Sequence, residues 1–209
     1  MFRRLSPLLV LCCLAAACAG VGANNPSTEE SASPTNTVFW ERYRIAGLEV
    51  EGYTTIADMS LAADSVVTAH VTGVEPGRVF QGDVAEDRVY YARVILEVEQ
   101  DLHGKAETST IPMELLLPQV FNDDGFEKAI AELDAAIPKD RILVFLREKN
   151  DPDPGVYRPV NSVGLFASTD RSVIDTPLSA EGLTSGLYQD ELAGIKTFDD
   201  LVALVAGAG

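Results

Sequence analysis

The position of the cysteines constrains the fold of this chain more than any other feature. All three, Cys12, Cys13 and Cys18, lie at the start of the 209-residue sequence. A domain formed by the rest of the chain must therefore fold without disulfides. Disulfides compensate mainly for the weak cores of small domains, and about 170 residues can bury roughly two thirds of the surface exposed by the unfolded chain. We expect a single globular domain, residues 38–207, held together by burial alone.

The first residues have the composition of an export signal. Arg3 and Arg4 supply a positively charged start, and the stretch from Leu5 to Ala17 is mostly apolar and ends in small side chains. This stretch is too short to span a bilayer, which needs about 20 apolar residues. Residues 1–17 are therefore interpreted as a signal peptide.

The end of this stretch, Leu14-Ala15-Ala16-Ala17-Cys18, resembles the lipobox of bacterial lipoproteins. The resemblance implies cleavage between Ala17 and Cys18 and a diacyl lipid on Cys18. It places the mature protein on the outer face of the cell membrane, with the lipid as its membrane contact. A secretory signal peptide without lipidation is the alternative.

The next segment predicts a tether. Residues 19–37 are rich in Gly, Asn, Pro, Ser and Thr and have almost no large apolar side chain, so they cannot bury enough surface to fold. A flexible segment of this length spans about 25 Å. Residues 18–37 are therefore expected to be a lipidated cysteine followed by a disordered tether that keeps the domain close to the membrane.

The charge excludes one class of partner. The chain has 16 basic and 32 acidic residues and a net charge of −16. Loss of Arg3 and Arg4 with the leader would make it −18. Proteins hold nucleic acids largely by neutralising phosphates with Lys and Arg, so we expect no nucleic-acid partner and no adhesion of the domain itself to anionic lipid headgroups.

Alternating and continuous apolar patterns predict most of the domain to be strands. The sequence Glu75-Pro76-Gly77 is expected to end the first strand, and Asp101–Lys105 is expected to be a turn after the second. The turn signal at 150–155 separates the long strands from three short ones. The predicted strands are 64–75, 89–99, 110–117, 141–148, 156–160, 163–167 and 172–174.

Two segments have helical periodicity. Apolar residues four, three and four apart, from Phe126 to Ile137, predict a helix over 124–137. A C-terminal helix begins after Thr197, which can cap it together with Asp200 three residues on. A short helix is also expected near residues 54–61.

The order of these elements predicts a mainly β fold with minor α. Three strands, a helix and two further strands is the order of the OB type, a five-stranded, partly open Greek-key barrel. Ala63–Val74, Arg141–Leu146 and the turn Leu102-His103-Gly104-Lys105 resemble segments of exported bacterial domains related to netrin-like barrels. Those domains usually carry disulfides, so the resemblance implies a shape and not a ligand. An immunoglobulin-like β-sandwich is the alternative, but it gives no reason for the helix at 124–137.

No motif predicts nucleophilic catalysis. Serine and cysteine nucleophiles need a base, usually histidine, and His70 and His103 are the only histidines, neither in a recognisable triad. His103 lies near Asp101, which is interpreted as an ordinary turn arrangement. The segment Gly182–Gly186 lacks the Gly-x-Ser-x-Gly spacing. We predict no catalytic residue and no cofactor site.

Metal binding is not indicated either. Zinc sites rely on soft or imidazole ligands in threes or fours, which two scattered histidines and no domain cysteine do not supply. Calcium takes clustered oxygens, and the available clusters are interpreted as solvated acidic turns. These clusters are Asp151 with Asp153, and Asp83 with Glu86 and Asp87.

Two further groups could carry chemistry but have plainer interpretations. Glu97 and Glu99 share one strand face about 7 Å apart, as exposed strand carboxylates often do. Aromatic residues could form a sugar-stacking surface, yet strands recruit such residues for packing. These aromatics are Phe39, Trp40, Tyr90 and Tyr91.

The sequence therefore favours a lipid-anchored, non-catalytic module that binds or supports an unknown envelope protein or polymer. The alternative is a hydrolase that acts on cell-wall or extracellular polymer through two carboxylates, which need no sequence motif.

Overall fold

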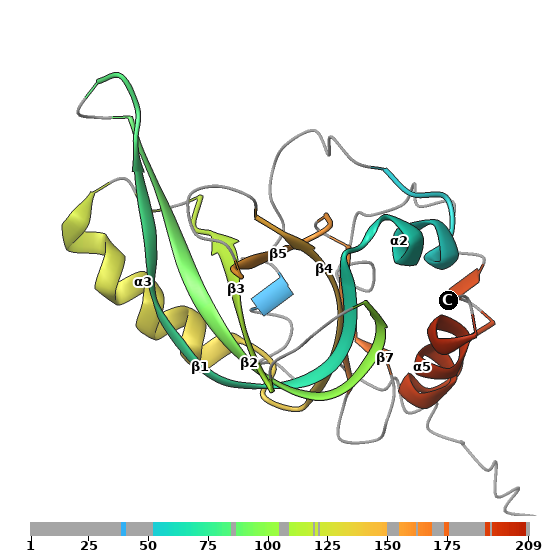
Figure 1. The fold of residues 1–209 in the computed structure, drawn as a ribbon. Helices are drawn as coiled ribbons and strands as arrows, with labels where there is room; N and C mark the ends of the chain where they lie inside the picture. The colour runs from blue at the N-terminus through green and yellow to red at the C-terminus, as the bar shows by residue number, and fades with distance from the viewer. Residues whose placement is uncertain are drawn as a thin grey trace, which may run out of the picture. The chain divides into compact units, whose positions relative to one another are not determined.

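The computed structural model describes residues 39–40, 52–84, 87–104, 109–118, 120, 122–149, 155–161, 163–168, 174–175, 191–192 and 194–207. All of them belong to one compact unit, Ser31–Gly209. This unit is mainly β (Figure 1).

The described elements follow the predicted order, and β4 has the predicted bounds. The helices are α2 (Ile56–Ala62), α3 (Asp123–Ala136) and α5 (Phe198–Ala206). The strands are β1 (Ser65–Gln81), β2 (Arg88–Gly104), β3 (Thr110–Leu116), β4 (Arg141–Glu148), β5 (Tyr157–Pro159), β6 (Leu165–Ser168) and β7 (Ile174–Asp175).

The strands form one sheet in the order β1-β2-β3-β5-β4-β6-β7, and β1 also pairs with β4. This second pairing joins the first five strands in a ring-like arrangement. Strands β3 and β5 pair in parallel, and the other pairs are antiparallel. Helix α3 lies between β3 and β4 in the chain and packs with the apolar side chains that line the ring.

Two hydrophobic cores lie on opposite faces of β1 and β4. One contains Val67 and Val144 with alternate residues of β2 and β3 and the apolar face of α3. The other contains Val66 and Phe145 with the apolar residues of α2 and α5. The first half of β1 is therefore buried on both faces. The alternation of buried and exposed residues that is typical of a half-buried strand begins only at His70, because the pairing of β1 with β4 ends there.

The C-terminal helix begins at the predicted cap. The Thr197 hydroxyl accepts a hydrogen bond from the Asp200 backbone N–H, and the Asp200 carboxylate accepts one from the Thr197 N–H, both at 3.1 Å. These reciprocal bonds satisfy two backbone donors that the first helical turn leaves unpaired. Buried Phe198, Leu201 and Val205 then fix α5 in the second core.

Two predicted turns are wrong. Pro76 and Gly77 lie inside β1, which continues to Gln81. This part of β1 pairs with β2 but not with β4, so a proline is tolerated at its unpaired edge. Residues 101–104 likewise belong to β2, which extends to Gly104 and pairs there with Ser65. Gly104 has a φ of 123°, a conformation open to glycine.

Candidate functional site

The structure does not bring the two histidines together. His70 is exposed on β1, and His103 is half-buried near the end of β2. His103 lies opposite Val66, four residues before His70 on β1, which corresponds to about 13 Å along the strand. The two imidazoles therefore do not form a shared site.

Of the two predicted strand carboxylates, Glu97 is exposed and Glu99 belongs to an ion-pair cluster. The Glu99 carboxylate accepts hydrogen bonds from Arg141 at 2.5 Å and from the Thr68 hydroxyl at 3.2 Å. Arg141 also binds Asp199 of α5 at 2.7 Å and lies 5.3 Å from the Phe198 ring centroid. We call Arg141, Glu99 and Asp199 the Arg141 cluster. It ties α5 to the sheet.

Three of the four aromatic candidates pack inside the domain. Phe39 and Trp40 are buried against each other in the first core, with ring centroids 4.6 Å apart. Tyr90 is buried, packs against Phe126 of α3 and donates a hydrogen bond to Asp123 at 3.0 Å. These three rings offer no stacking surface. Tyr91, on the other face of β2, is half-buried.

The acidic turn candidates do not assemble into a metal site where they are described. Asp83 and Asp87 are exposed between β1 and β2. Within the described residues, no group of three His, Cys, Asp or Glu side chains is placed to hold a metal ion. The other candidates lie outside the described residues, as do the lipobox and Cys18: they are Glu86, Asp151, Asp153 and Gly182–Gly186.

A charged cluster that the sequence did not predict lies on the outer face of β2 and β3. Its base is Glu114 of β3, whose side chain is 2% exposed. The Glu114 carboxylate pairs with Arg78 of β1 at 3.4 Å and with Lys149, which follows β4. Both cations also lie over the Tyr91 ring, 5.3 and 4.6 Å from its centroid. Arg93 is directly opposite Glu114 on β2.

A β-bulge explains how Arg78 reaches this cluster. Pro76 pairs with Ala92 and Val79 with Tyr90, so Gly77 and Arg78 together face Tyr91. A Cβ on Gly77 would lie 2.6 Å from the Tyr91 carbonyl oxygen, so glycine is needed for this close approach. Bulges change the direction of a side chain and are common beside functional sites. Here the bulge places the guanidinium over the Tyr91 ring.

The cluster has three cations and one carboxylate, and three of its buried side-chain atoms have no hydrogen-bond partner among the described residues. These atoms are Glu114 Oε1, Arg93 Nε and Arg78 Nε, although Arg78 bonds Glu114 through Nη2. Buried polar atoms are nearly always paired, and each exception needs an explanation. We call Glu114, Arg78, Lys149, Arg93 and Tyr91 the Glu114 cluster.

A second feature is the far end of the β1–β2 hairpin, which we call the arm (residues 79–84 and 87–89). Strand β3 pairs with β2 only from Tyr91 onward, so the arm is a two-stranded extension beyond the other strands (Figure 1). Four of the six exposed large hydrophobic side chains of the described residues belong to it: Val79, Phe80, Val84 and Val89.

Hydrogen bonds order the arm and join it to α3. Gln81 donates to the Val84 carbonyl at 3.0 Å and accepts from Arg88 at 2.9 Å. Arg88 also pairs with Asp123 at 2.7 Å. Two hydrogen bonds hold the pKa of the Asp123 carboxyl below its usual value. The one from Arg88 has the larger effect and the one from Tyr90 the next largest. The arm therefore presents its apolar side chains on an ordered framework.

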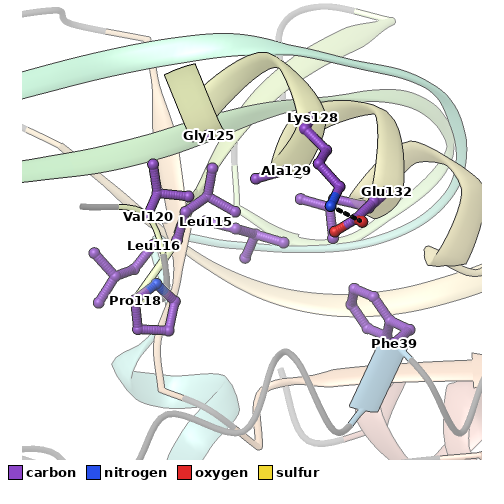
Figure 2. A pocket seen from close by; sticks show the side chains of 11 residues that line it. Phe39, Leu115, Leu116, Pro118, Val120, Gly125, Lys128, Ala129 and Glu132 are labelled. Carbon is purple, nitrogen blue, oxygen red and sulfur yellow. Dashed lines mark ion pairs between the residues drawn. The ribbon is translucent and has the colours of Figure 1, made fainter. Parts of the chain in front are cut away.

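A pocket of about 250 Å³ lies between the end of β3, α3 and Phe39 (Figure 2). Its lining is largely apolar, and the Lys128–Glu132 ion pair, 3.7 Å long, belongs to its wall. Its volume is below the range of about 300–1,000 Å³ typical of ligand pockets, and no unsatisfied polar atom lines it. We assign it no ligand.

No described helix is both long and apolar enough to cross a membrane. Comparison with known proteins gives no further assignment, since no family model, curated protein or solved structure matches the chain.

Proposed function

We propose that this chain is an exported bacterial lipoprotein whose domain is a non-catalytic binding module of the cell envelope. The arm is its contact surface. The observation that carries this proposal is the concentration of exposed apolar side chains on a two-stranded extension. Isolated hairpins are marginally stable in water, and clustered apolar side chains on a surface mark interaction sites. The leader and the pattern Leu14–Cys18 support the anchor.

The fold that best accounts for the strand pairings is an OB-like, partly open Greek-key barrel. Closure of five strands through the β1–β4 pairing, the parallel β3–β5 pair and the position of α3 between β3 and β4 all support it. In such a barrel the β1–β2 and β4–β5 connections lie near a common binding face. This arrangement supports the arm as the surface that a partner contacts.

The occupant of the arm is a protein with an apolar surface edged by basic residues. Phe80 and Val84 are the most exposed apolar side chains of the arm, at 57% and 53%. They are flanked by the exposed carboxylates of Asp83 and Asp87. These carboxylates have no ion pair with any described residue. An acidic apolar tip on an acidic chain disfavours anionic lipid headgroups and favours a basic protein surface.

Site-specific photocrosslinking in intact cells tests the arm. A photoreactive amino acid at Phe80 is expected to give one discrete adduct, and Asp83→Lys with Asp87→Lys should reduce its yield at least tenfold. Leu61 of α2 is the matched control, because it is 68% exposed and lies outside the arm. Equal adducts from positions 80 and 61, or an adduct unaffected by the charge reversals, would contradict the proposal.

Cys18→Ala tests the anchor. Loss of the thiol that carries the lipid should abolish lipid labelling and release the protein from the membrane fraction. Ser6→Ala in the leader is the control, since it leaves Cys18 intact. Unchanged membrane retention of the Cys18→Ala variant would overturn the lipoprotein assignment.

A further inference from the structure

We propose that the Glu114 cluster is a binding site for a single oxyanion, a carboxylate or a phosphate group on an otherwise uncharged molecule. This site is separate from the arm and goes beyond the function proposed above. The guanidinium of Arg93 and the ammonium of Lys149 bind the oxyanion.

The balance of charge is the first argument. Arg78 and Lys149 share the carboxylate of Glu114. Arg93 lies directly opposite Glu114 and forms no ion pair with a described carboxylate, although the net charge of the chain is −16. Glu75 is opposite Arg93 on β1, but it is exposed and forms no ion pair with Arg93. Partly buried charge of one sign is costly unless an opposite charge compensates it. An anion would supply that charge.

The hydrogen-bonding capacity is the second argument. A guanidinium has five N–H donors and an ammonium has three. Arg93 makes no hydrogen bond or ion pair with any described residue, and Lys149 uses its ammonium for Glu114 and the Tyr91 ring. The planar fork of an arginine matches the two oxygens of a carboxylate or phosphate. Arg93 is therefore the main donor to the bound group.

The depth of the side chains is the third argument. The Glu114 side chain is 2% exposed, whereas those of Lys149 and Arg78 are 15% and 22% exposed. The carboxylate thus lies at the base and the cations lie nearer to solvent. Glu114 holds Lys149 and Arg78 against Tyr91, so the positive groups are positioned before any anion arrives. Such preorganisation lowers the entropic cost of binding.

The single uncompensated charge of Arg93 limits the ligand. Charges farther away than about 8 Å are largely screened at physiological salt, so the cluster can attract one anionic group despite the acidic chain. The surrounding carboxylates would repel each further negative charge of a polyanion. The ligand class is therefore a molecule with one oxyanion, as a sugar acid or a phosphate ester has.

A titration of the full-length protein, kept in neutral detergent at constant ionic strength, tests the site. The probes are inorganic phosphate and sodium acetate, followed through the backbone amide chemical shifts. At least one probe is expected to shift the amides of Arg93, Glu114 and Lys149 with a Kd on the order of 1 mM. The probe that binds more tightly identifies the phosphate or the carboxylate class.

Arg93→Gln should raise this Kd at least tenfold, and Arg93→Lys should raise it less. Arg88→Gln is the matched control, because Arg88 is a partly exposed arginine of the same strand and pairs with Asp123 instead. The Arg88→Gln variant should bind the probe with the same Kd as the wild type. Equal weakening by Arg93→Gln and Arg88→Gln, or no saturable shift with either probe, would overturn the proposal. Crosslinking from Phe80 would remain unchanged in Arg93→Gln, which separates this site from the arm.

Discussion

The Arg141 cluster and the Glu114 cluster have opposite compositions. In the Arg141 cluster one cation meets two carboxylates, and Glu99 and Asp199 are 43% and 74% exposed. In the Glu114 cluster two cations pair with one carboxylate that is almost fully buried, and a third cation, Arg93, lies opposite it on the neighbouring strand. The first cluster has every charge paired and joins α5 to the sheet. The second keeps unsatisfied buried atoms on Arg93 and Glu114.

This difference separates a structural ion pair from a candidate binding site. Exposed ion pairs contribute about 0–1 kcal/mol, and losing one leaves no buried charge behind. A buried carboxylate among cations is costly to disturb, because its removal leaves those cations without compensation. Solvent exposure and the ratio of charges are therefore the properties that distinguish the two clusters.

The largest expected effect is that of Glu114→Gln. It should lower the free energy of unfolding by about 3 kcal/mol, because Arg78 and Lys149 would lose their shared carboxylate. Glu99→Gln is the matched change in the Arg141 cluster and should cost less than about 1 kcal/mol. Urea unfolding followed by circular dichroism measures both. Equal losses in the two variants would remove the distinction between the clusters.

Gly77→Ala should have the next largest effect. The new Cβ would lie 2.6 Å from the Tyr91 carbonyl oxygen, so the bulge must shift, at a cost of about 1–3 kcal/mol. The shift would move Arg78 away from Glu114. Gly73→Ala is the control, because a Cβ there meets no atom within 4 Å. Both free energies of unfolding can be measured in urea, and similar values for the two variants would contradict the role given to the bulge.

The smallest effect belongs to the pair that joins the arm to α3. Because Arg88 and Tyr90 lower the pKa of Asp123, the ionised carboxylate stabilises the fold above its unfolded pKa of about 4. This contribution is lost as the pH falls through the lower folded value. Asp123→Asn should therefore be less stable than wild type at pH 7, and the two stabilities should converge once the pH is below the lowered pKa of the folded state. A constant difference between them at all pH values would contradict this assignment.

Local patterns predicted the elements that depend on local physics. The 4-3-4 spacing of apolar residues from Phe126 to Ile137 predicted α3, and the continuous apolar run predicted β4. Thr197 with Asp200 predicted the start of α5. Each relies on periodicity or capping within one segment.

Features set by distant pairing were not predictable in the same way. Pro76-Gly77 has the composition of a turn, and it forms a bulge because β2 continues alongside it. The burial of Glu114 depends on Lys149 from the far end of β4 and on Arg78 from that bulge. One sequence signal was present: Glu114 is the single charge in the apolar run from Ile111 to Leu117, and a charged residue in a buried strand is rare unless paired.

The most direct test of the difference between the clusters is thermal unfolding in 10 mM phosphate against chloride at equal ionic strength. If the Glu114 cluster binds one oxyanion with a Kd of about 1 mM, phosphate should raise the Tm of the wild type by roughly 3–5 °C. Glu99→Gln should show the same rise and Arg93→Gln none. An equal rise in Arg93→Gln, or no rise in the wild type, would contradict the account.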